Sequence, residues 1–160
     1  MTNRHNQPTS LRNFRHASLL VVEDNKDHWF LIKMALEQSL PEVEPMWAAN
    51  REEALQYLNS CLLNGTDLPK LILLDLYLPK REDGWELLQE IKDQSSSFKQ
   101  VPVVVLSYSN AQEDITESYF HGSTSYVTKP ADAQAWMEYT QKLRTYWWET
   151  VTLPSDRYMT

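Results

Sequence analysis

Short, uninterrupted apolar runs recur along this chain of 160 residues, and each run is followed by a stretch with helical periodicity. Apolar runs of this length, without polar alternation, are typical of strands covered on both faces of a parallel sheet. Pro45 lies in one of them and indicates a strand that begins irregularly or lies away from the centre of the sheet. The predicted strands span residues 18–22, 43–49, 71–76, 101–106 and 124–128.

Helices are predicted between the strands from the spacing of their apolar residues. Asn50 and Glu53 form a capping-box pattern at the start of one of them. The helical segments cover residues 27–40, 50–63, a segment around 85–91, 110–121 and 131–148. Five strand–helix repeats predict a single α/β domain with a doubly wound parallel sheet. We expect a flexible arm over residues 1–16, the domain over 17–148 and a tail over 149–160.

Charge and cysteine content exclude several classes of protein. The 15 Lys and Arg against 22 Asp and Glu give a net charge of −7, which argues against a nucleic-acid partner. Cys61 is the single cysteine, so neither a disulfide framework nor a cysteine metal cluster is expected. The chain shows neither a signal peptide nor an apolar segment approaching the roughly 20 residues that span a bilayer. We expect a cytoplasmic protein that does not bind membranes.

Polar residues that can carry chemistry follow the predicted strands. Parallel sheets bind ligands at the carboxyl ends of their strands, so these side chains are expected at one edge. Clustered carboxylates repel unless a cation joins them, and oxygen ligands suit Mg²⁺. An aspartate there can attack phosphorus and form an aspartyl phosphate. The residues are Glu23, Asp24, Asp75, Ser107 and Lys129.

Four motifs in the same order and spacing give this chain a specific resemblance to the receiver domains of two-component response regulators. They are VVEDN, LLDLYLP, VVVLSYS and YVTKP. The resemblance implies a flavodoxin-like (βα)5 sheet with strand order 2-1-3-4-5. It also implies that Asp75 is the phosphoacceptor and that Asp24 binds Mg²⁺ directly. Glu23 would hold the ion through water, and Asp75 and the Tyr77 carbonyl would be further ligands.

The same resemblance assigns roles to residues around the transferred group. Ser107 would hydrogen-bond the phosphoryl group, and Lys129 would pair with it. Tyr126 falls at the position of the aromatic residue that moves with activation, although a tyrosine packed on the sheet edge predicts the same sequence. The bond between Lys129 and Pro130 would be cis, as is usual in the family.

A narrower resemblance points to stand-alone response regulators that are partnered with phytochrome-type histidine kinases. Its carriers are EDNKDHWFLIKMAL, SYFHGSTSYVTKP and YWWETVTLP. The implied function is a single-domain regulator that accepts a phosphoryl group on Asp75 from a sensor histidine kinase. Output would pass through protein–protein contact, because no helix-turn-helix pattern follows Leu143.

Two other functions share features with this sequence. A pseudo-receiver adaptor that is not phosphorylated is the main alternative. A phosphatase of the haloacid dehalogenase type needs an acid two residues after its nucleophile, and Tyr77 stands there instead. We therefore expect no enzyme activity beyond self-catalysed phosphorylation and dephosphorylation.

Some positions depart from the family pattern. PKREDG places five steps between Pro79 and Gly84, where four are more usual, so the loop beside the acceptor is expected to bulge. Tyr77 and Tyr108 are larger than the residues usual at their positions. Two phenols beside Asp75 could hinder water, which predicts slow autodephosphorylation.

The last helix carries more aromatic residues than one buried face requires. Trp148 and the ETVTLP segment after it are therefore predicted to form an interface in a homodimer. The alternative is that the tail folds back and covers the aromatics within one chain. None of the four histidines has a second ligand at metal spacing, so structural or solvated roles are predicted for them.

Overall fold

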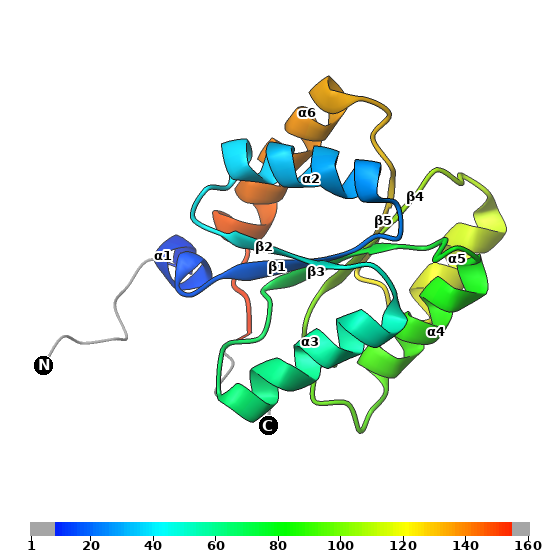
Figure 1. Ribbon diagram of the computed structural model, residues 1–160, viewed down its shortest axis with the longest axis horizontal. Coiled ribbons are helices and arrows are strands. Elements are labelled where there is room, and N and C mark those ends of the chain that lie inside the picture. Colours follow the sequence, from blue (N-terminus) through cyan, green and yellow to red (C-terminus); the bar gives the residue numbers. More distant parts are fainter. Residues whose placement is uncertain (1–8, 155–160) are drawn as a thin grey trace, which may run out of the picture.

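Five parallel strands form the centre of the protein in the computed structural model, which describes residues 9–154 (Figure 1). They are hydrogen-bonded in the order β2-β1-β3-β4-β5, which confirms the predicted doubly wound sheet and its strand order. All four neighbouring pairs are parallel. The strands are β1 (Ser18–Val22), β2 (Glu44–Ala48), β3 (Leu71–Asp75), β4 (Val103–Ser107) and β5 (Ser125–Thr128).

Helices cover both faces of this sheet. Helices α2 and α6 lie on one face, and α3, α4 and α5 lie on the other (Figure 1). Within residues 9–154 no helix is both long and apolar enough to cross a membrane. The helices are α1 (Thr9–Phe14), α2 (Lys26–Ser39), α3 (Arg51–Asn64), α4 (Arg81–Lys92), α5 (Gln112–Phe120), α6 (Ala133–Leu143) and the π-helical turn η2 (Arg144–Trp148).

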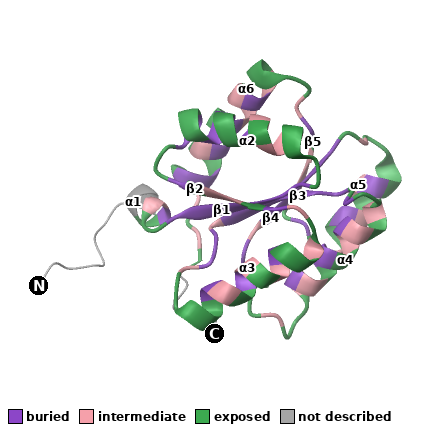
Figure 2. Ribbon diagram, in the orientation of Figure 1, coloured by how far each residue is buried: buried purple, intermediate pink, exposed green. Residues whose placement is uncertain are grey.

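The continuous apolar runs are explained by burial on both sides of the sheet (Figure 2). In β1, Leu20 and Val22 join the core under α3 and α4. Leu19 and Val21 join the core under α2 and α6. Successive strand residues point to opposite faces, so an apolar residue is needed at every position.

Local signals in the sequence correspond to local structure. Pro45 lies in β2, an edge strand, where its missing N–H costs no ladder hydrogen bond on the open side. The Asn50 side chain caps α3 by accepting from the Glu53 N–H, as predicted. A Cβ atom on Gly84 would overlap the Leu76 carbonyl oxygen, so glycine lets α4 approach the end of β3.

Both ends of the described chain pack on the α2–α6 side. Residues 1–8 of the expected arm lie outside the described residues, whereas Thr9–Phe14 form helix α1. Asn13 is buried, and its amide donates to the carbonyl oxygens of Trp147, Trp148 and Val151 at 3.4, 3.2 and 2.6 Å. This part of the N-terminal segment is therefore tied to the C-terminal segment.

The C-terminal aromatic residues are mostly core residues. Trp148 is 0% exposed and Trp147 is 9% exposed, and Val151 and Leu153 pack against the same cluster. The prediction that Trp148 forms an interface is wrong, because α1 and residues 151–154 complete its surroundings within one chain. Tyr146 stays exposed beside them. Residues 155–160 of the tail lie outside the described residues.

Candidate functional site

Three carboxylates meet at the carboxyl edge of the sheet. Asp75 is the last residue of β3, and Glu23 and Asp24 follow β1 directly. One oxygen of each lies within 4.8 Å of the others. Glu23 is 1% exposed and Asp75 is 7% exposed, whereas Asp24 faces solvent. The predicted cluster therefore forms, with two of its members inside the protein.

Lys129 supplies a buried positive charge to this cluster. It follows β5 and is 4% exposed, and its backbone N–H donates to the Ser107 carbonyl at 2.8 Å. Its Nζ donates to Glu23 Oε2 at 2.6 Å and lies 3.4 Å from Asp75 Oδ2. The closer partner of the ammonium is thus Glu23, where the resemblance predicted a pairing with the group on Asp75.

The electrostatics of the site favour a cation. Burial, and then the charge of Glu23, raise the pKa of Asp75 to about 7. Burial and Glu23 likewise raise the pKa of Asp24. Both shifts show that these groups resist carrying their negative charges side by side. An all-oxygen donor set of this kind fits a hard divalent ion such as Mg²⁺, so the residues present suit the metal that the fold implies.

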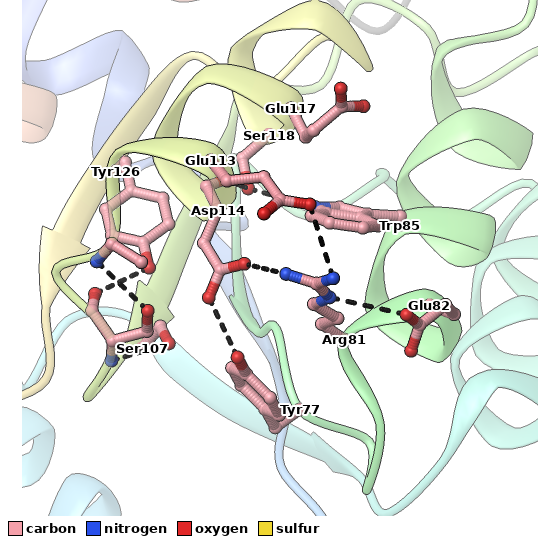
Figure 3. Close-up of polar contacts among 12 residues, drawn as sticks. Tyr77, Arg81, Glu82, Trp85, Ser107, Glu113, Asp114, Glu117, Ser118 and Tyr126 are labelled. Atoms are coloured by element: carbon pink, nitrogen blue, oxygen red, sulfur yellow. Dashed lines mark hydrogen bonds and ion pairs between the residues drawn. The ribbon is translucent and has the colours of Figure 1, made fainter.

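Ser107 and Tyr126 converge on the loop after β4. Ser107 ends β4 and is buried, and its Oγ accepts from the Ser109 N–H at 3.0 Å. The Tyr126 hydroxyl donates to the Ser109 carbonyl oxygen at 2.7 Å, and Tyr126 packs against the core under α3 and α4 (Figure 3). The two predicted switch residues therefore contact opposite sides of one loop residue.

A cavity of about 430 Å³ opens over the acidic cluster. Ser107 and Tyr126 do not line it, but several residues that sequence reasoning passed over do. Its lining comprises Glu23, Asp24, Asn25, His28, Asp75, Tyr77, Tyr108, Ser109 and Lys129.

His28, like Asn25 and Ser109, lines the cavity although it was not predicted from the sequence. Its Nδ1 accepts from Lys129 Nζ at 3.0 Å and lies 3.6 Å from Glu23 Oε1. We predicted a structural or solvated role for His28, and its contacts with Lys129 and Glu23 place that side chain in the site. The signal was the Asn25 cap, whose side chain accepts from the His28 N–H and so places His28 in the first turn of α2, beside the cavity.

Two tyrosines form the rim of the cavity. Tyr108 is exposed, and its ring centroid lies 5.2 Å from Lys129 Nζ and 5.8 Å from the His28 ring. Tyr77 follows Asp75 by two residues, and its backbone N–H donates to Asp75 Oδ1 at 3.2 Å. The rim over the acceptor is therefore aromatic, as the sequence predicted.

The cis peptide bond near the site is not the expected one. It joins Leu78 and Pro79 in the loop after β3, and the bond between Lys129 and Pro130 is trans. The resemblance placed the cis bond after Lys129, so that prediction is wrong.

Comparison with known proteins was made on sequence and on structure. Residues 19–141 match the family described as "Response regulator receiver domain". The chain is 36% identical over 138 residues to the response regulator Rcp1 of Synechocystis sp., covering 86% of this chain and 92% of that protein. It is 36% identical over 129 residues to the probable methanogenesis regulatory protein FilR2 of Methanothrix harundinacea, covering 81% and 82% of the two.

Solved structures give the same result. The phosphorylated cyanobacterial phytochrome response regulator RcpA superimposes with a TM-score of 0.76 at 39% identity, covering 88% of this chain and 99% of that one. The Mn²⁺-bound form of Rcp1 gives a TM-score of 0.74 at 35% identity, covering 87% and 99%.

Proposed function

Because the chain belongs to the response regulator receiver domain family, we propose that it accepts a phosphoryl group on Asp75 from a sensor histidine kinase. The observation that carries the proposal is the surroundings of Asp75. A buried carboxylate at the end of β3 lies beside two further carboxylates and a buried ammonium, and it opens into a cavity. This arrangement suits phosphoryl transfer, in which little covalent chemistry is required beyond positioning and charge stabilisation.

The proposed reaction is an in-line displacement at phosphorus. An Asp75 carboxylate oxygen forms the new bond to phosphorus as the bond from the kinase histidine nitrogen breaks, and that nitrogen keeps the electron pair. The Tyr77 N–H and Lys129 already contact the Asp75 carboxylate, so they fix its direction. Lys129 would then turn from Glu23 toward the new phosphoryl oxygens.

Glu23, Asp24, Asp75 and the Tyr77 carbonyl would hold the metal, with Glu23 acting through water. Mg²⁺ bound there would neutralise charge on the phosphoryl oxygens. That the relative Rcp1 has a Mn²⁺-bound form supports the binding of a divalent ion by this chain.

Ser107 and Tyr126 would read the phosphorylated state. Ser107 Oγ would donate to a phosphoryl oxygen, which would draw the Ser109 loop toward the cavity. Tyr126 holds the other side of that loop through the Ser109 carbonyl and would move with it. The α5–β5 surface would then change for a partner protein, as a shift between two pre-existing states.

The kinase is proposed to be of the phytochrome type, supported by the likeness to RcpA, a cyanobacterial phytochrome response regulator. A homodimer is part of the proposal, with exposed Tyr146 at its contact in place of buried Trp148.

We also propose a cytoplasmic location and no nucleic-acid partner, the latter supported by the net charge of −7. Domain limits of 17–148 are proposed for the receiver, with α1 and residues 151–154 packed onto it. The unphosphorylated adaptor is not favoured, since every predicted site residue is present.

The test is intact-protein mass after incubation with acetyl phosphate and Mg²⁺, for wild type and Asp75→Ala. One phosphate on wild type alone is expected, and sizing before and after phosphorylation tests the dimer. Transfer from a purified phytochrome-type kinase, in preference to an unrelated kinase, tests the partner. A folded wild type that neither gains phosphate nor binds beryllofluoride would overturn the proposal in favour of an adaptor.

A further inference from the structure

The acceptor loop is tied to helix α5 by one side-chain hydrogen bond. The Tyr77 hydroxyl donates to Asp114 Oδ2 at 2.8 Å, although the residues are 37 positions apart (Figure 3). We propose that Asp114 is a positioning residue that holds the Tyr77 ring at the rim of the cavity and thereby lengthens the lifetime of a phosphoryl group on Asp75. This inference rests on the proposed function.

Tyr77 bridges the acceptor and α5. At one end its backbone N–H contacts Asp75, and at the other its hydroxyl contacts Asp114. The side chain between them is 39% exposed and lines the cavity. An exposed tyrosine without such a bond is free to exchange rotamers on the nanosecond scale. The bond to Asp114 therefore selects the orientation in which the ring borders the cavity.

The Asp114 side chain is held in place by burial and by its hydrogen-bond partners. It is 1% exposed, and each of its carboxylate oxygens has a partner. Arg81 Nη1 donates to Oδ1 at 2.8 Å, and the Tyr77 hydroxyl donates to Oδ2. Burying a charge is costly unless it is paired and hydrogen-bonded, and both conditions are met here. Arg81 lies in the lengthened stretch between Pro79 and Gly84.

Further residues of α4 and α5 support the contacts that hold Asp114. The Arg81 guanidinium lies 5.1 Å from the centre of the Trp85 ring, and Trp85 Nε1 donates to Ser118 Oγ at 3.2 Å. Ser118 Oγ in turn donates to the Asp114 carbonyl oxygen at 2.7 Å (Figure 3). Arg81 thus holds the side chain of Asp114 and Ser118 holds its backbone, in addition to the bond from Tyr77.

Charge at Asp114 is maintained by its partners. The Arg81 guanidinium lies 2.8 Å from Asp114 Oδ1, so the Tyr77 hydroxyl donates to a carboxylate that is already paired with a positive charge. Hydrogen bonds to an ionised acceptor of this kind are roughly twice as strong as those between neutral groups. Ser109 also contacts Ser107 and Tyr126, which places Asp114 beside the proposed switch loop.

A Tyr77 ring that is held at the rim of the cavity obstructs the entry of water. Hydrolysis of an aspartyl phosphate needs a water molecule in line with the bond between phosphorus and the Asp75 oxygen, and that water must enter through the cavity. Tyr77 and Tyr108 form the rim through which it passes. When the bond to Asp114 is lost, the Tyr77 ring can swing into solvent and widen the entrance. Loss of phosphate should then become faster.

The experiment is a double-mutant cycle on phosphate half-life. Tyr77→Phe, Asp114→Ala and the double variant are phosphorylated with acetyl phosphate and Mg²⁺, freed of the donor, and followed by intact mass. Each single variant should lose phosphate about fivefold faster than wild type, as expected for one hydrogen bond of ordinary net strength. The double variant should be no faster than either single variant. Glu113→Ala is the control, because Glu113 contacts Arg81 from the same turn of α5 without an interaction with Tyr77.

Several results would overturn the inference. One is an unchanged half-life in Tyr77→Phe, which removes only the hydroxyl from a residue that is 39% exposed. Another is an Asp114→Ala effect of equal size in the Tyr77→Phe background, which would show that Asp114 acts only on structure. If wild type itself takes no phosphate, the proposed function fails and this inference falls with it. A phosphorylated wild type with unaltered variants overturns this inference alone.

Discussion

Lys129 is bonded to Glu23 more closely than to Asp75, with Nζ 2.6 Å from Glu23 Oε2 and 3.4 Å from Asp75 Oδ2. Both members of the closer pair are almost completely buried. Removing one partner of such a pair leaves an uncompensated charge inside the protein. The lysine is thus a structural counter-ion in addition to its proposed role toward the phosphoryl group.

Lys129→Met should therefore lower the free energy of unfolding by about 3 kcal/mol, because Glu23 loses its counter-ion. Urea unfolding in EDTA measures this without a contribution from metal. Lys33→Met is the matched control, since Lys33 forms an exposed i,i+4 pair with Glu37. That control should change stability by less than about 0.5 kcal/mol. Equal losses in the two variants would contradict the prediction.

Asp75→Asn should stabilise the protein in metal-free buffer at pH 8, by an amount on the order of 2 kcal/mol. The folded-state pKa of Asp75 is raised to about 7. The folded protein therefore retains this proton between about pH 4 and 7, and stability is lost as pH rises through that window. The gain from Asp75→Asn should be smaller at pH 5 than at pH 8. Urea unfolding in EDTA at the two pH values measures this gain. A variant less stable than wild type at pH 8 would contradict the prediction.

The aromatic rim should make autodephosphorylation slow. Replacing both rim residues, in a Tyr77→Asn, Tyr108→Ala double variant, should shorten the phosphate half-life by about tenfold, the equivalent of about 1.4 kcal/mol in barrier height. The half-life is read from intact mass after the phosphate donor is removed. Phe30→Ala removes an exposed aromatic residue outside the cavity and should leave the half-life unchanged. A double variant as long-lived as wild type would contradict this account of the rim.

The sheet could be predicted because its strands are apolar at every position. Leu19 and Leu20 belong to different cores, and only a strand covered on both faces needs both of them. The acidic cluster could also be predicted from the sequence, since the carboxyl ends of the strands converge in a parallel sheet. The position of His28 in the site was not predicted, because it depends on how Asn25 caps α2.

The ends of the chain were harder to predict from sequence. Helix α1 has six residues, and an isolated helix of that length is unstable in water. It forms against the C-terminal segment, through a contact between residues more than 130 positions apart. Trp148 was misplaced for the same reason, since the residues that cover it come from both ends of the described chain. Long-range packing of this kind leaves no local pattern.

Lys92 should produce a pH-dependent stability. Burial lowers its pKa to about 8, although Nζ donates to the carbonyl oxygens of Lys99 and Val101 at 3.0 and 2.6 Å. Between about pH 8 and the ordinary lysine pKa of about 10.4, the unfolded chain binds the proton and the folded chain does not. Stability from this group therefore rises with pH across that window.

A comparison of wild type with Lys92→Met isolates this contribution from other titrating groups. The difference in unfolding free energy should move in favour of wild type between about pH 8 and 10, and should be constant between about pH 6 and 7. Urea unfolding at each pH provides the measurement. A difference that stays constant up to pH 10 would show that the two carbonyls keep Lys92 charged in the folded protein.

Asn13 should contribute more to the free energy of unfolding than its position in a short terminal helix suggests. Its buried amide donates to three carbonyls of the C-terminal segment, and its Oδ1 accepts from the Leu153 N–H at 3.4 Å. Asn13→Ala leaves buried carbonyls without a donor, so the free energy of unfolding should fall by about 2 kcal/mol. Hydrogen exchange at Leu153 should become faster at the same time. Asn64→Ala, at the exposed end of α3, is the control and should change neither. Unchanged exchange at Leu153 in Asn13→Ala would show that the aromatic core alone holds the two ends together.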